Sequence, residues 1–520
     1  MTTAVRPPEP SFPPLDGIHR PAPDVGEVGL RRRIDEILNR RPAVGLAVGV
    51  VRDGRPMFFH GHGLADITSR TPITEDTVFR VGSVTKLFTA IAVMQLWERG
   101  LVDLDAPADA YLRAYRLDRE RAGWRPATLR HLLTHTSGIP EVRGIGDLLH
   151  SSLTPAGGRP ATLSVRFGDP LPSLAEYYRD GLRSVVEPGT AFAYSNHGFA
   201  TLGQIVEDVS GMPLVQYIEE RILRPLGMAD SGLVRTDRLA ARLATGYSLG
   251  RTGPRVVADR EWIDGGAGQL YATARDMGRF AAALLGGGNE SGRILESATL
   301  TEMLEPHFQP DPRIPGIGLA FFRGEVGGHR TAGHDGILPG FNAGLVLAPD
   351  DGVGLFALTN VGGAFGWLQI ELDRLLRELL GVSDEARTGV PQHPEIWPDL
   401  CGRYVFLPRI ADLRNRLMLS GGVQVVVVGG RLVVRLLTPV PVPFRGLPLE
   451  PEDERDPDVF RLDLSPYGIA PIRLVFAREA GRPATAAHTD LGGQPWSLVR
   501  RPDAGIAGRW LRPALAAMTA

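Results

Sequence analysis

The sequence predicts an α/β (α+β) fold, in which helices pack against antiparallel β-sheet, followed by a small all-β domain. Residues 87–97 form an apolar run that is typical of a helix buried on every side. Residues 342–349 and 353–360 are interpreted as neighbouring antiparallel strands joined by a turn at 350–352. From residue 423 onward, short strands alternate with turns, which indicates a small antiparallel β-barrel.

The chain is long enough for two domains. It has 520 residues, 43% of them hydrophobic, and single domains usually span about 100–200 residues. We expect, in order, a disordered Pro-rich leader (1–25), a large first domain (26–385), a linker (386–398), a β-barrel domain (399–502) and a tail (503–520). Strands of the barrel are expected at residues 423–428, 431–437, 459–464 and 472–476.

Composition and charge exclude several classes of function. The formal net charge is -2, and no arginine run is longer than residues 31–33, which argues against a nucleic-acid partner. The most apolar helical run is far shorter than the ~20 residues needed to cross a bilayer, and the N-terminus has no signal-peptide core. Cys401 is the only cysteine, so an intramolecular disulfide is impossible. These observations predict a cytoplasmic protein without a nucleic-acid or membrane partner.

Lys86 is the only lysine in a chain with 57 lysine and arginine residues. Arginine therefore serves at every other basic position. A guanidinium group cannot release its proton at any accessible pH, whereas a desolvated ammonium group can. The single lysine points to a proton-transfer role, and the alternative is chance survival of one codon in an arginine-biased chain.

Ser83 lies three residues before Lys86, at the predicted start of the apolar helix. Side chains three apart share one helical face, with Cβ atoms about 5–6 Å apart, so the lysine amine can reach the serine hydroxyl. The first turn leaves backbone N–H groups free to stabilise an oxyanion, and burial lowers the pKa of the lysine. We therefore predict a nucleophilic serine assisted by a lysine. Taken alone, the Ser-x-x-Lys pattern is also compatible with Ser83 as a helix N-cap.

Other candidate sites in the sequence have weaker support. The Gly-x-Ser-x-Gly pattern at 246–250 is followed by Arg-Thr-Gly-Pro where a nucleophile elbow needs a helix, so we interpret it as a surface turn. His131 and His135 have the spacing of zinc ligands, but the glutamate and a third ligand are missing, so both are predicted to be structural. Residues 60–62 are interpreted as a strand end. Since no nucleotide-binding motif occurs either, neither a cofactor nor a metal is predicted.

Tyr194 and Asn196 follow a turn signal at residues 187–189. Polar side chains two residues apart on an extended or loop segment point the same way, so both can face one cleft. Tyr194 beside a lysine would ionise more easily and act as a base, while Asn196 would bind the lysine and a substrate carbonyl. The alternative is a turn with a packed tyrosine.

A third segment, residues 330–341, contains His334, Gly336 and Ile337 and precedes the strand at 342–349. A glycine at 336 would let a substrate backbone lie close to the strand edge, where a strand N–H group would bind the oxyanion. Read alone, the glycines of this segment indicate only a hairpin.

Three segments in this order resemble the motifs of the serine β-lactamase and penicillin-binding-protein superfamily: Ser83-Val84-Thr85-Lys86, Tyr194-Ser195-Asn196 and His334-Asp335-Gly336. Residues 132–140 and 265–277 are similar to other recurrent stretches of its class C β-lactamase-like branch of esterases and D-aminopeptidases. The resemblance covers about residues 26–385.

The resemblance implies an antiparallel sheet flanked by helices, a helical subdomain, a site in the cleft between them, and a lipocalin-like C-terminal barrel. It implies that Ser83 attacks a carbonyl to form an acyl-enzyme, that Tyr194 and Lys86 relay the proton to the leaving group, and that water releases the acyl group. The N–H groups of Ser83 and Ile337 would form the oxyanion hole. The residues implied to bind substrate are Asn196, His334, Gly336 and Ile337.

One departure from the family pattern bears on the substrate. True β-lactamases carry a lysine in the third motif where this chain has His334, and histidine is mostly neutral near pH 7. The cation that receives the carboxylate of a β-lactam is therefore missing. We expect a serine hydrolase that cleaves a small ester, an amide or a short D-amino-acid peptide, and a β-lactam only weakly. The segment 141–172 is interpreted as an inserted loop that helps select substrate, or as a disordered excursion.

Two other functions remain open at this point. An acyltransferase would use the same acyl-enzyme with an alcohol or amine acceptor in place of water. A non-turnover sensor would be acylated once and hold the acyl group, but the membrane helix or effector domain that usually accompanies it is not predicted. The sequence predicts a small-molecule partner and leaves assembly into a homo-oligomer open.

Overall fold

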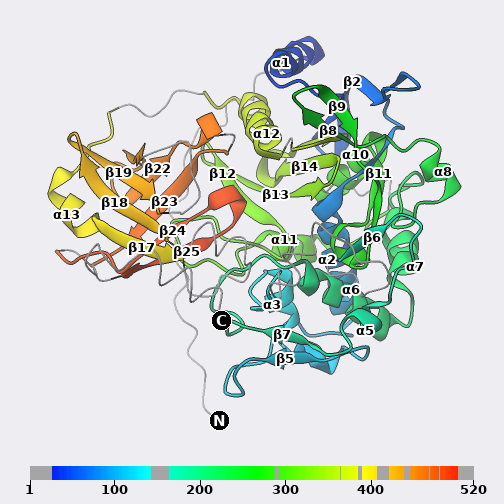
Figure 1. The fold of residues 1–520 in the computed structure, drawn as a ribbon, viewed down its shortest axis with the longest axis horizontal. Helices are drawn as coiled ribbons and strands as arrows, with labels where there is room; N and C mark the ends of the chain where they lie inside the picture. Colours follow the sequence, from blue (N-terminus) through cyan, green and yellow to red (C-terminus); the bar gives the residue numbers. More distant parts are fainter. Residues whose placement is uncertain are drawn as a thin grey trace.

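The computed structural model describes residues 26–141, 163–286, 292–363, 365–383, 389–406, 421–437, 446–467, 469–479 and 481–501. The predicted leader, the predicted tail and residues 142–162 of the predicted insert lie outside these ranges. Two bodies of structure lie side by side in Figure 1, with the strands after residue 400 on the left and the earlier elements on the right. The domain boundaries set out above remain predictions.

The centre of the larger body is a seven-stranded antiparallel sheet, as expected. Its strand order is β12-β13-β14-β15-β1-β2-β3. The strands are β1 (Gly45–Arg52), β2 (Arg55–Asp66), β3 (Thr71–Pro72), β12 (Phe322–Val326), β13 (His329–Leu338), β14 (Phe341–Ala348) and β15 (Val353–Thr359). The predicted hairpin is confirmed, because β14 pairs with β15 from Asn342↔Thr359 to Ala348↔Val353, and Gly352 turns the chain at φ 63°.

Helices cover both faces of this sheet (Figure 1). Helices α1 (Glu27–Arg40) and α12 (Phe365–Leu380) pack on one face, where they share a hydrophobic core with Leu46, Val48 and Val50 of β1. Helices α2 (Thr85–Glu98) and α10 (Ala274–Leu284) belong to the other core, which contains Ala47 and Val51. Strand β1 is apolar at successive positions because both of its faces are covered.

Helix α2 is buried on every side, as the apolar run predicts. From Thr85 to Leu96 every side chain except Gln95 is buried. Further helices surround it: α3 (Leu129–Leu133), α5 (Leu174–Tyr177), α6 (Asn196–Ser210), α7 (Leu214–Ile218), α8 (Asp237–Ala240), α9 (Gly265–Gly268) and α11 (Ser297–Leu304). Short strands form three two-stranded pairs in this region, from β4 (Val78–Arg80), β5 (Leu117–Arg119), β6 (Ser164–Arg166), β7 (Leu182–Ser184), β10 (Arg260–Trp262) and β11 (Tyr271–Thr273), and a three-stranded sheet from β8 (Tyr247–Gly250), β9 (Gly253–Val256) and β16 (Val361–Gly362). Within the described parts of the chain, no helix is both long enough and apolar enough to span a membrane.

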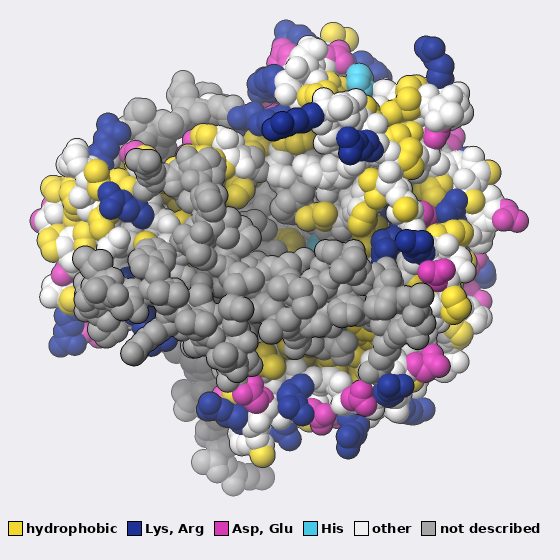
Figure 2. All heavy atoms as spheres, in the orientation of Figure 1, with side chains coloured by type: hydrophobic (Ala, Val, Ile, Leu, Met, Phe, Trp, Pro, Cys, Tyr) yellow, Lys and Arg dark blue, Asp and Glu magenta, His cyan; other side chains and the backbone are white. Residues whose placement is uncertain are grey.

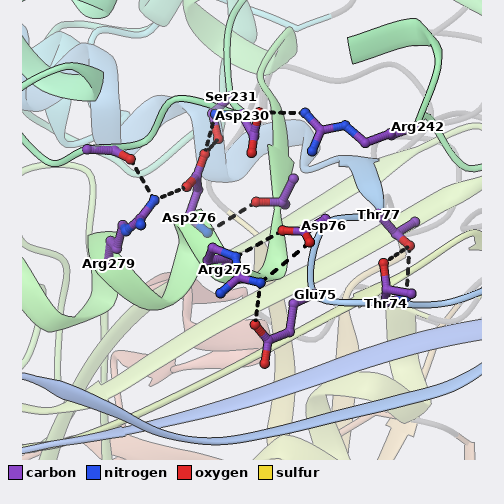
Figure 3. Close-up of polar contacts among 12 residues, drawn as sticks. Thr74, Glu75, Asp76, Thr77, Asp230, Ser231, Arg242, Arg275, Asp276 and Arg279 are labelled. Carbon is purple, nitrogen blue, oxygen red and sulfur yellow. Dashed lines mark hydrogen bonds and ion pairs between the residues drawn. The ribbon is translucent and has the colours of Figure 1, made fainter. Parts of the chain in front are cut away.

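A polar network fixes the start of α10 (Figure 3). The carboxylate of Asp276, in the first turn of α10, accepts hydrogen bonds from the Ser231 hydroxyl and the Asp230 backbone N–H, both at 2.9 Å, and pairs with Arg279 at 2.9 Å. Arg275 pairs with Asp76 at 2.9 Å. A carboxylate in the first turn of a helix is stabilised by the helix dipole. The network anchors α10 beneath the sheet and takes no part in the site described below.

The smaller body is a nine-stranded antiparallel sheet that curls into a nearly closed barrel. Its strand order is β20-β19-β18-β17-β25-β24-β23-β22-β21. The strands are β17 (Gly402–Phe406), β18 (Val423–Val428), β19 (Arg431–Leu436), β20 (Leu447–Pro448), β21 (Glu450–Pro451), β22 (Val459–Leu462), β23 (Ile472–Ala477), β24 (Ala486–Thr489) and β25 (Trp496–Arg501). The strands expected from the sequence correspond to β18, β19, β22 and β23.

The two edge strands of the barrel, β20 and β21, are consecutive in the chain. Leu449 alone separates them, and its N–H donates to the carbonyl of Leu432 at 2.9 Å. One bent segment therefore pairs with β19 on one side and with β22 on the other. The interior is filled with apolar side chains, among them Tyr404, Phe460 and Phe476. Trp397, near the end of the predicted linker, also packs into this core.

Candidate active site

Ser83 lies in a single 3₁₀ turn, Gly82–Val84, which connects strand β4 to helix α2. Gly82 has φ 54°, a left-handed conformation that favours glycine. A Cβ atom on Gly336 of β13 would lie 1.9 Å from the Val81 carbonyl oxygen. Gly336 is therefore required for contact between β13 and the nucleophile segment. The sequence interpretation gave this glycine a different reason, the approach of substrate.

The ammonium group of Lys86 has three hydrogen-bond partners. Its Nζ atom donates to Ser83 Oγ at 3.0 Å, to Asn196 Oδ1 at 2.6 Å and to the Ala267 carbonyl at 2.7 Å. The side chain is completely buried. Of the three partners only the serine hydroxyl can also donate a hydrogen bond, because a carbonyl or amide oxygen only accepts. When Lys86 is neutral, its lone pair must therefore face Ser83, whose proton it can accept.

Burial lowers the pKa of Lys86 toward neutral pH. Desolvation lowers the pKa of Lys86 to about 8, and the carboxylates of Asp264 and Glu141 oppose this shift. Asp264 is itself buried, and burial raises its pKa well above the usual range. A neutral amine is thus available to a useful fraction of the molecules near pH 8, which suits a general base.

Tyr194 contacts the same serine from the other side. Its hydroxyl hydrogen-bonds the Ser83 side chain, and Lys86 Nζ lies 5.0 Å from the centre of its ring. The expectation that the lysine would ease ionisation of this phenol is wrong in direction. Burial raises the pKa of Tyr194 and outweighs the hydrogen bond from Ser83, which lowers it. Tyr194 is therefore a protonated donor near neutral pH, and Lys86 is the better base.

Asn196 meets Lys86 as predicted, but from a helix rather than from an extended segment. It is the first residue of α6, and Ser195 caps that helix by accepting a hydrogen bond from the Gly198 N–H. Glu141 accepts from both the Asn196 backbone N–H and its Nδ2 atom, each at 2.7 Å. Because a carboxylate only accepts and an ammonium only donates, these contacts fix which way the Asn196 amide faces.

His334 is buried and neutral. Its Nδ1 atom donates to the Asp335 carbonyl at 2.7 Å, so Nε2 carries a lone pair, and this atom has no hydrogen-bond partner among the described residues. Burial first, and then the charge of Lys86, lower the pKa of His334 to about 3. The third motif thus presents a hydrogen-bond acceptor where a cation would be needed to receive a carboxylate.

Ile337 brings a second backbone amide to the nucleophile. Its nitrogen lies 3.0 Å from the position that a Cβ atom of Gly82 would occupy, so β13 runs directly past the turn that carries Ser83. The side chain of Ile337 is 52% exposed. The structure thus brings together all seven residues predicted for the site: Ser83, Lys86, Tyr194, Asn196, His334, Gly336 and Ile337.

Several residues beside the site were not predicted. Glu141 and Asp264 each adjoin one of the stretches noted above, 132–140 and 265–277, and that adjacency was the available signal. His135 was interpreted as structural only, but its ring stacks on Tyr194 with centroids 4.2 Å apart. Phe322 stacks on His334 at 4.5 Å. His135 lies within the stretch 132–140 noted above, whereas nothing in the local sequence marks Phe322 as a neighbour of the site.

The alternative sites of the sequence have other structural roles. Residues 246–250 lie in a hairpin of β8 (Tyr247–Gly250) and β9 (Gly253–Val256), with Ser248 exposed. His131 closes the first turn of α3, where it accepts a hydrogen bond from the Thr128 N–H. Residues 60–62 lie within β2. In the described ranges, no group of three His, Cys, Asp or Glu side chains is placed to hold a metal ion.

Comparison with known proteins agrees with this geometry. A family model described as Beta-lactamase matches residues 30–372. A human protein named Putative beta-lactamase-like 1 is 30% identical over 378 residues, which cover 66% of this chain and 69% of that protein. Esterase EstB of Burkholderia gladioli is 34% identical over 233 residues, which cover 44% of this chain and 56% of the esterase.

A solved structure shows the same fold. The D-amino acid amidase of Ochrobactrum anthropi SV3, complexed with L-phenylalanine amide, is 27% identical, with a TM-score of 0.54, and the match covers 68% of this chain and 99% of the amidase. The chain therefore belongs to the beta-lactamase family. Its relatives identify it as a hydrolase of the serine beta-lactamase type.

Proposed function

We propose that this protein hydrolyses an ester or amide through an acyl-enzyme formed on Ser83. The observation that carries the proposal is the set of partners around Lys86. Two obligate acceptors, Asn196 Oδ1 and the Ala267 carbonyl, occupy two of its hydrogen bonds, so that the neutral amine can only accept a proton from Ser83.

The proposed reaction has two stages. Ser83 Oγ attacks the substrate carbonyl carbon while its proton passes to Lys86 Nζ, and the resulting oxyanion is bound by the backbone N–H groups of Ser83 and Ile337. As the tetrahedral intermediate collapses, Tyr194 donates its proton to the leaving group and recovers one from Lys86. Water then attacks the acyl carbonyl, which releases the acid and restores the serine hydroxyl. Each oxyanion donor contributes about 10²–10³ in rate in comparable hydrolases.

The substrate is proposed to lack the carboxylate that a β-lactam carries beside its scissile bond. His334 is neutral, because burial and the charge of Lys86 lower its pKa to about 3. A substrate carboxylate would therefore find no cation in the third motif. Small esters, amides and short D-amino-acid peptides fit better, and the named esterase and amidase relatives support this choice.

The face drawn in Figure 2 carries both apolar and charged side chains. Hydrophobic side chains lie in a recess near the centre of the face drawn in Figure 2, between the barrel and the larger body. Basic and acidic side chains are interspersed over the coloured part of this face.

The test compares wild type with Ser83→Ala on a p-nitrophenyl ester, a D-alanine p-nitroanilide and a chromogenic cephalosporin. We expect Ser83→Ala to lose at least about 10³-fold in ester or amide turnover, while the cephalosporin is a poor substrate of the wild type. Ser248→Ala is the matched control, because this exposed serine belongs to the other serine motif. Full activity in Ser83→Ala would overturn the proposal.

Intact-mass measurement separates the two alternatives. A stable acyl mass on Ser83 without turnover would assign the chain to sensors. Faster release of the p-nitrophenyl group on adding an alcohol or amine, with the acyl group recovered on that acceptor, would assign it to acyltransferases. Release of the free acid at the same rate with and without the acceptor supports hydrolysis.

A further inference from the structure

The barrel and the larger body share a hydrophobic cluster that extends to the candidate active site. Its buried members are Phe192, Ile317 and Trp496, and the side chains packed against them are Tyr194, Phe308, Phe322, Phe406 and Leu491. Trp496 opens β25, the strand beside β17 in the barrel. The cluster therefore joins the barrel directly to the side chain that contacts Ser83.

Four rings of this region form a column from the barrel to the nucleophile. Trp496 meets Phe192 edge-on, with centroids 5.5 Å apart, and Phe192 meets His135 edge-on at 5.9 Å. His135 then stacks on Tyr194 at 4.2 Å with an interplanar angle of 30°. Trp496, Phe192, His135 and Tyr194 are called the ring column below. Each ring contacts the next, so the column is continuous from Trp496 to Tyr194.

Hydrogen bonds join His135 to the two residues that flank Tyr194 in the chain. Its carbonyl accepts from the Ala193 N–H at 2.7 Å, and its Nδ1 accepts from the Ser195 N–H at 3.1 Å. Its backbone has φ 55°, which is unfavourable for a residue with a side chain. Because Nδ1 accepts, the neutral ring carries its hydrogen on Nε2, and this atom has no hydrogen-bond partner among the described residues. Contacts with the neighbouring rings, rather than a second hydrogen bond, therefore hold the Nε2 side of the imidazole in place.

A second contact reaches the site from the same part of the barrel. Gly493 has φ 74°, and a Cβ atom on it would lie 3.2 Å from Cβ of Phe322. Phe322 in turn stacks on His334 with an interplanar angle of 25°. The segment from Gly493 to Trp496 thus lies behind both Tyr194 and His334.

Charged contacts fix how the barrel lies against the larger body. Arg313 pairs with Asp456 at 3.1 Å and donates to the Phe476 carbonyl, while Arg473 donates to the Arg313 carbonyl at 3.2 Å. Arg473 also pairs with Glu325, next to the end of β12, at 3.7 Å. Charge-assisted hydrogen bonds of this kind restrict orientation as well as adding energy. The barrel is therefore docked in one geometry, which is what a positioning role requires.

We propose that the barrel positions the Tyr194 hydroxyl for catalysis through the ring column, with Trp496 as the positioning residue. This inference rests on the proposed function, in which Tyr194 protonates the leaving group. Trp496 contacts neither substrate nor the reacting atoms. A displacement of about 1 Å at a reacting group costs up to about 10²-fold in rate, so the loss of one ring behind Tyr194 is enough to matter.

The experiment measures kcat and KM for the p-nitrophenyl ester with wild type, Trp496→Ala and Trp496→Phe. We expect Trp496→Ala to lower kcat roughly 10- to 100-fold with KM changed by less than about threefold. Trp496→Phe keeps a ring against Phe192 and should recover most of kcat. Circular dichroism and thermal unfolding show whether the variants fold. If Trp496→Ala does not fold, Phe192→Leu interrupts the ring column from the side of the larger body.

A double-mutant comparison separates positioning from general weakening. If Trp496 acts through Tyr194, then Trp496→Ala adds little further loss to the residual activity of Tyr194→Phe, because the group it positions is already absent. Val459→Ala is the matched control. Val459 belongs to another buried contact between the two bodies, with Ile314 and Val475, and has no ring contact with the column. We expect its kcat to equal that of wild type.

The outcomes distinguish this inference from the proposed function. Wild-type kcat in Trp496→Ala, or losses that add fully in the Tyr194→Phe background, would overturn the positioning role while leaving Ser83 and Tyr194 in place. An equal loss of kcat in Val459→Ala would overturn it too, since any weakened contact between the two bodies would then have the same effect as the loss of a ring in the column. Full activity in Tyr194→Phe would instead overturn the role of Tyr194 and this inference with it.

Discussion

The two sides of the candidate active site are built differently. On one side, the polar wall consists of Ser83, Lys86, Glu141, Asn196 and Asp264, which hydrogen bonds join around Lys86 and in which burial first, and then the acidic neighbours, set the pKa of Lys86. On the other, the aromatic wall consists of His135, Phe192, Tyr194, Phe322 and His334, whose rings contact one another edge-on or by stacking. The polar wall determines where protons go, and the aromatic wall determines where Tyr194 and His334 lie.

The walls also differ in charge. Lys86 is positively charged below a pH of about 8 and interacts with the acidic residues Glu141 and Asp264, whereas the two histidines of the aromatic wall are neutral because burial lowers their pKa values. Substitutions in the polar wall should therefore change pH dependence. Uncharged substitutions in the aromatic wall should mainly change rate or substrate preference.

The largest expected effect follows from Lys86→Arg. Arginine keeps the charge and a long side chain but cannot become a neutral base, so we expect kcat to fall by about 10²–10⁴-fold. Lys86→Met should be similarly impaired. Steady-state rates with the p-nitrophenyl ester check this expectation. Retention of activity within about tenfold by Lys86→Arg would mean that the lysine supplies only charge.

The second largest expected effect is the dependence of the wild-type kcat/KM on pH. Because the pKa of Lys86 is lowered to about 8, the amine is protonated and unable to act as a base below that pH. We expect kcat/KM to rise with pH through about 8 and to fall close to tenfold per unit well below it. Rates measured between about pH 6 and pH 9.5 test this. A flat profile over that range would exclude Lys86 as the base.

A substitution in the aromatic wall should alter substrate preference. His334→Lys introduces a cation at the third motif, and a charge-assisted hydrogen bond contributes about 1.5–3 kcal/mol. We expect kcat/KM for the carboxylate-bearing cephalosporin to rise at least roughly tenfold relative to the neutral ester. His334→Gln, which stays neutral, is the control. An equal change of this ratio in both variants would show that charge is not the cause.

The smallest expected effect follows from Glu141→Gln in the polar wall. The Glu141 carboxylate raises the pKa of Lys86 and orients Asn196. Its neutralisation should lower the apparent pKa of the pH profile by less than about one unit and reduce kcat a few-fold. Glu187→Gln removes a surface ion pair with Arg125 and serves as the control. A shift toward higher pH would contradict the assigned charge interaction.

The sequence predicts the polar wall better than the aromatic wall, and the reason is physical. Ser83 and Lys86 are three residues apart on a helix, so their proximity follows from local geometry. The rings at 135, 192, 322 and 496 meet only after the chain has folded, and no local spacing specifies their contacts. The pKa of Tyr194 was predicted in the wrong direction because it depends on burial, which residue types alone do not specify.

The fold, too, was predicted where local sequence determines it and missed where it does not. The buried helix and the hairpin of β14 and β15 follow from apolar runs and a turn, and both are confirmed. Asn196 was placed correctly beside Lys86, but its segment was predicted to be extended, whereas Ser195 caps a helix there. In the barrel, β20, β21, β24 and β25 were not predicted. Strand β24 was missed because Ala486-Ala487-His488-Thr489 has weak strand propensity.

The bent segment at Leu449 has a consequence for association of this protein with other chains. An open sheet edge is a template for pairing with a foreign strand. Here the two ends of the barrel sheet are the two halves of one continuous segment, and Pro448 and Pro451 lack the N–H groups that an added strand would need. The barrel thereby protects its own seam from strand addition, which is a safeguard against aggregation.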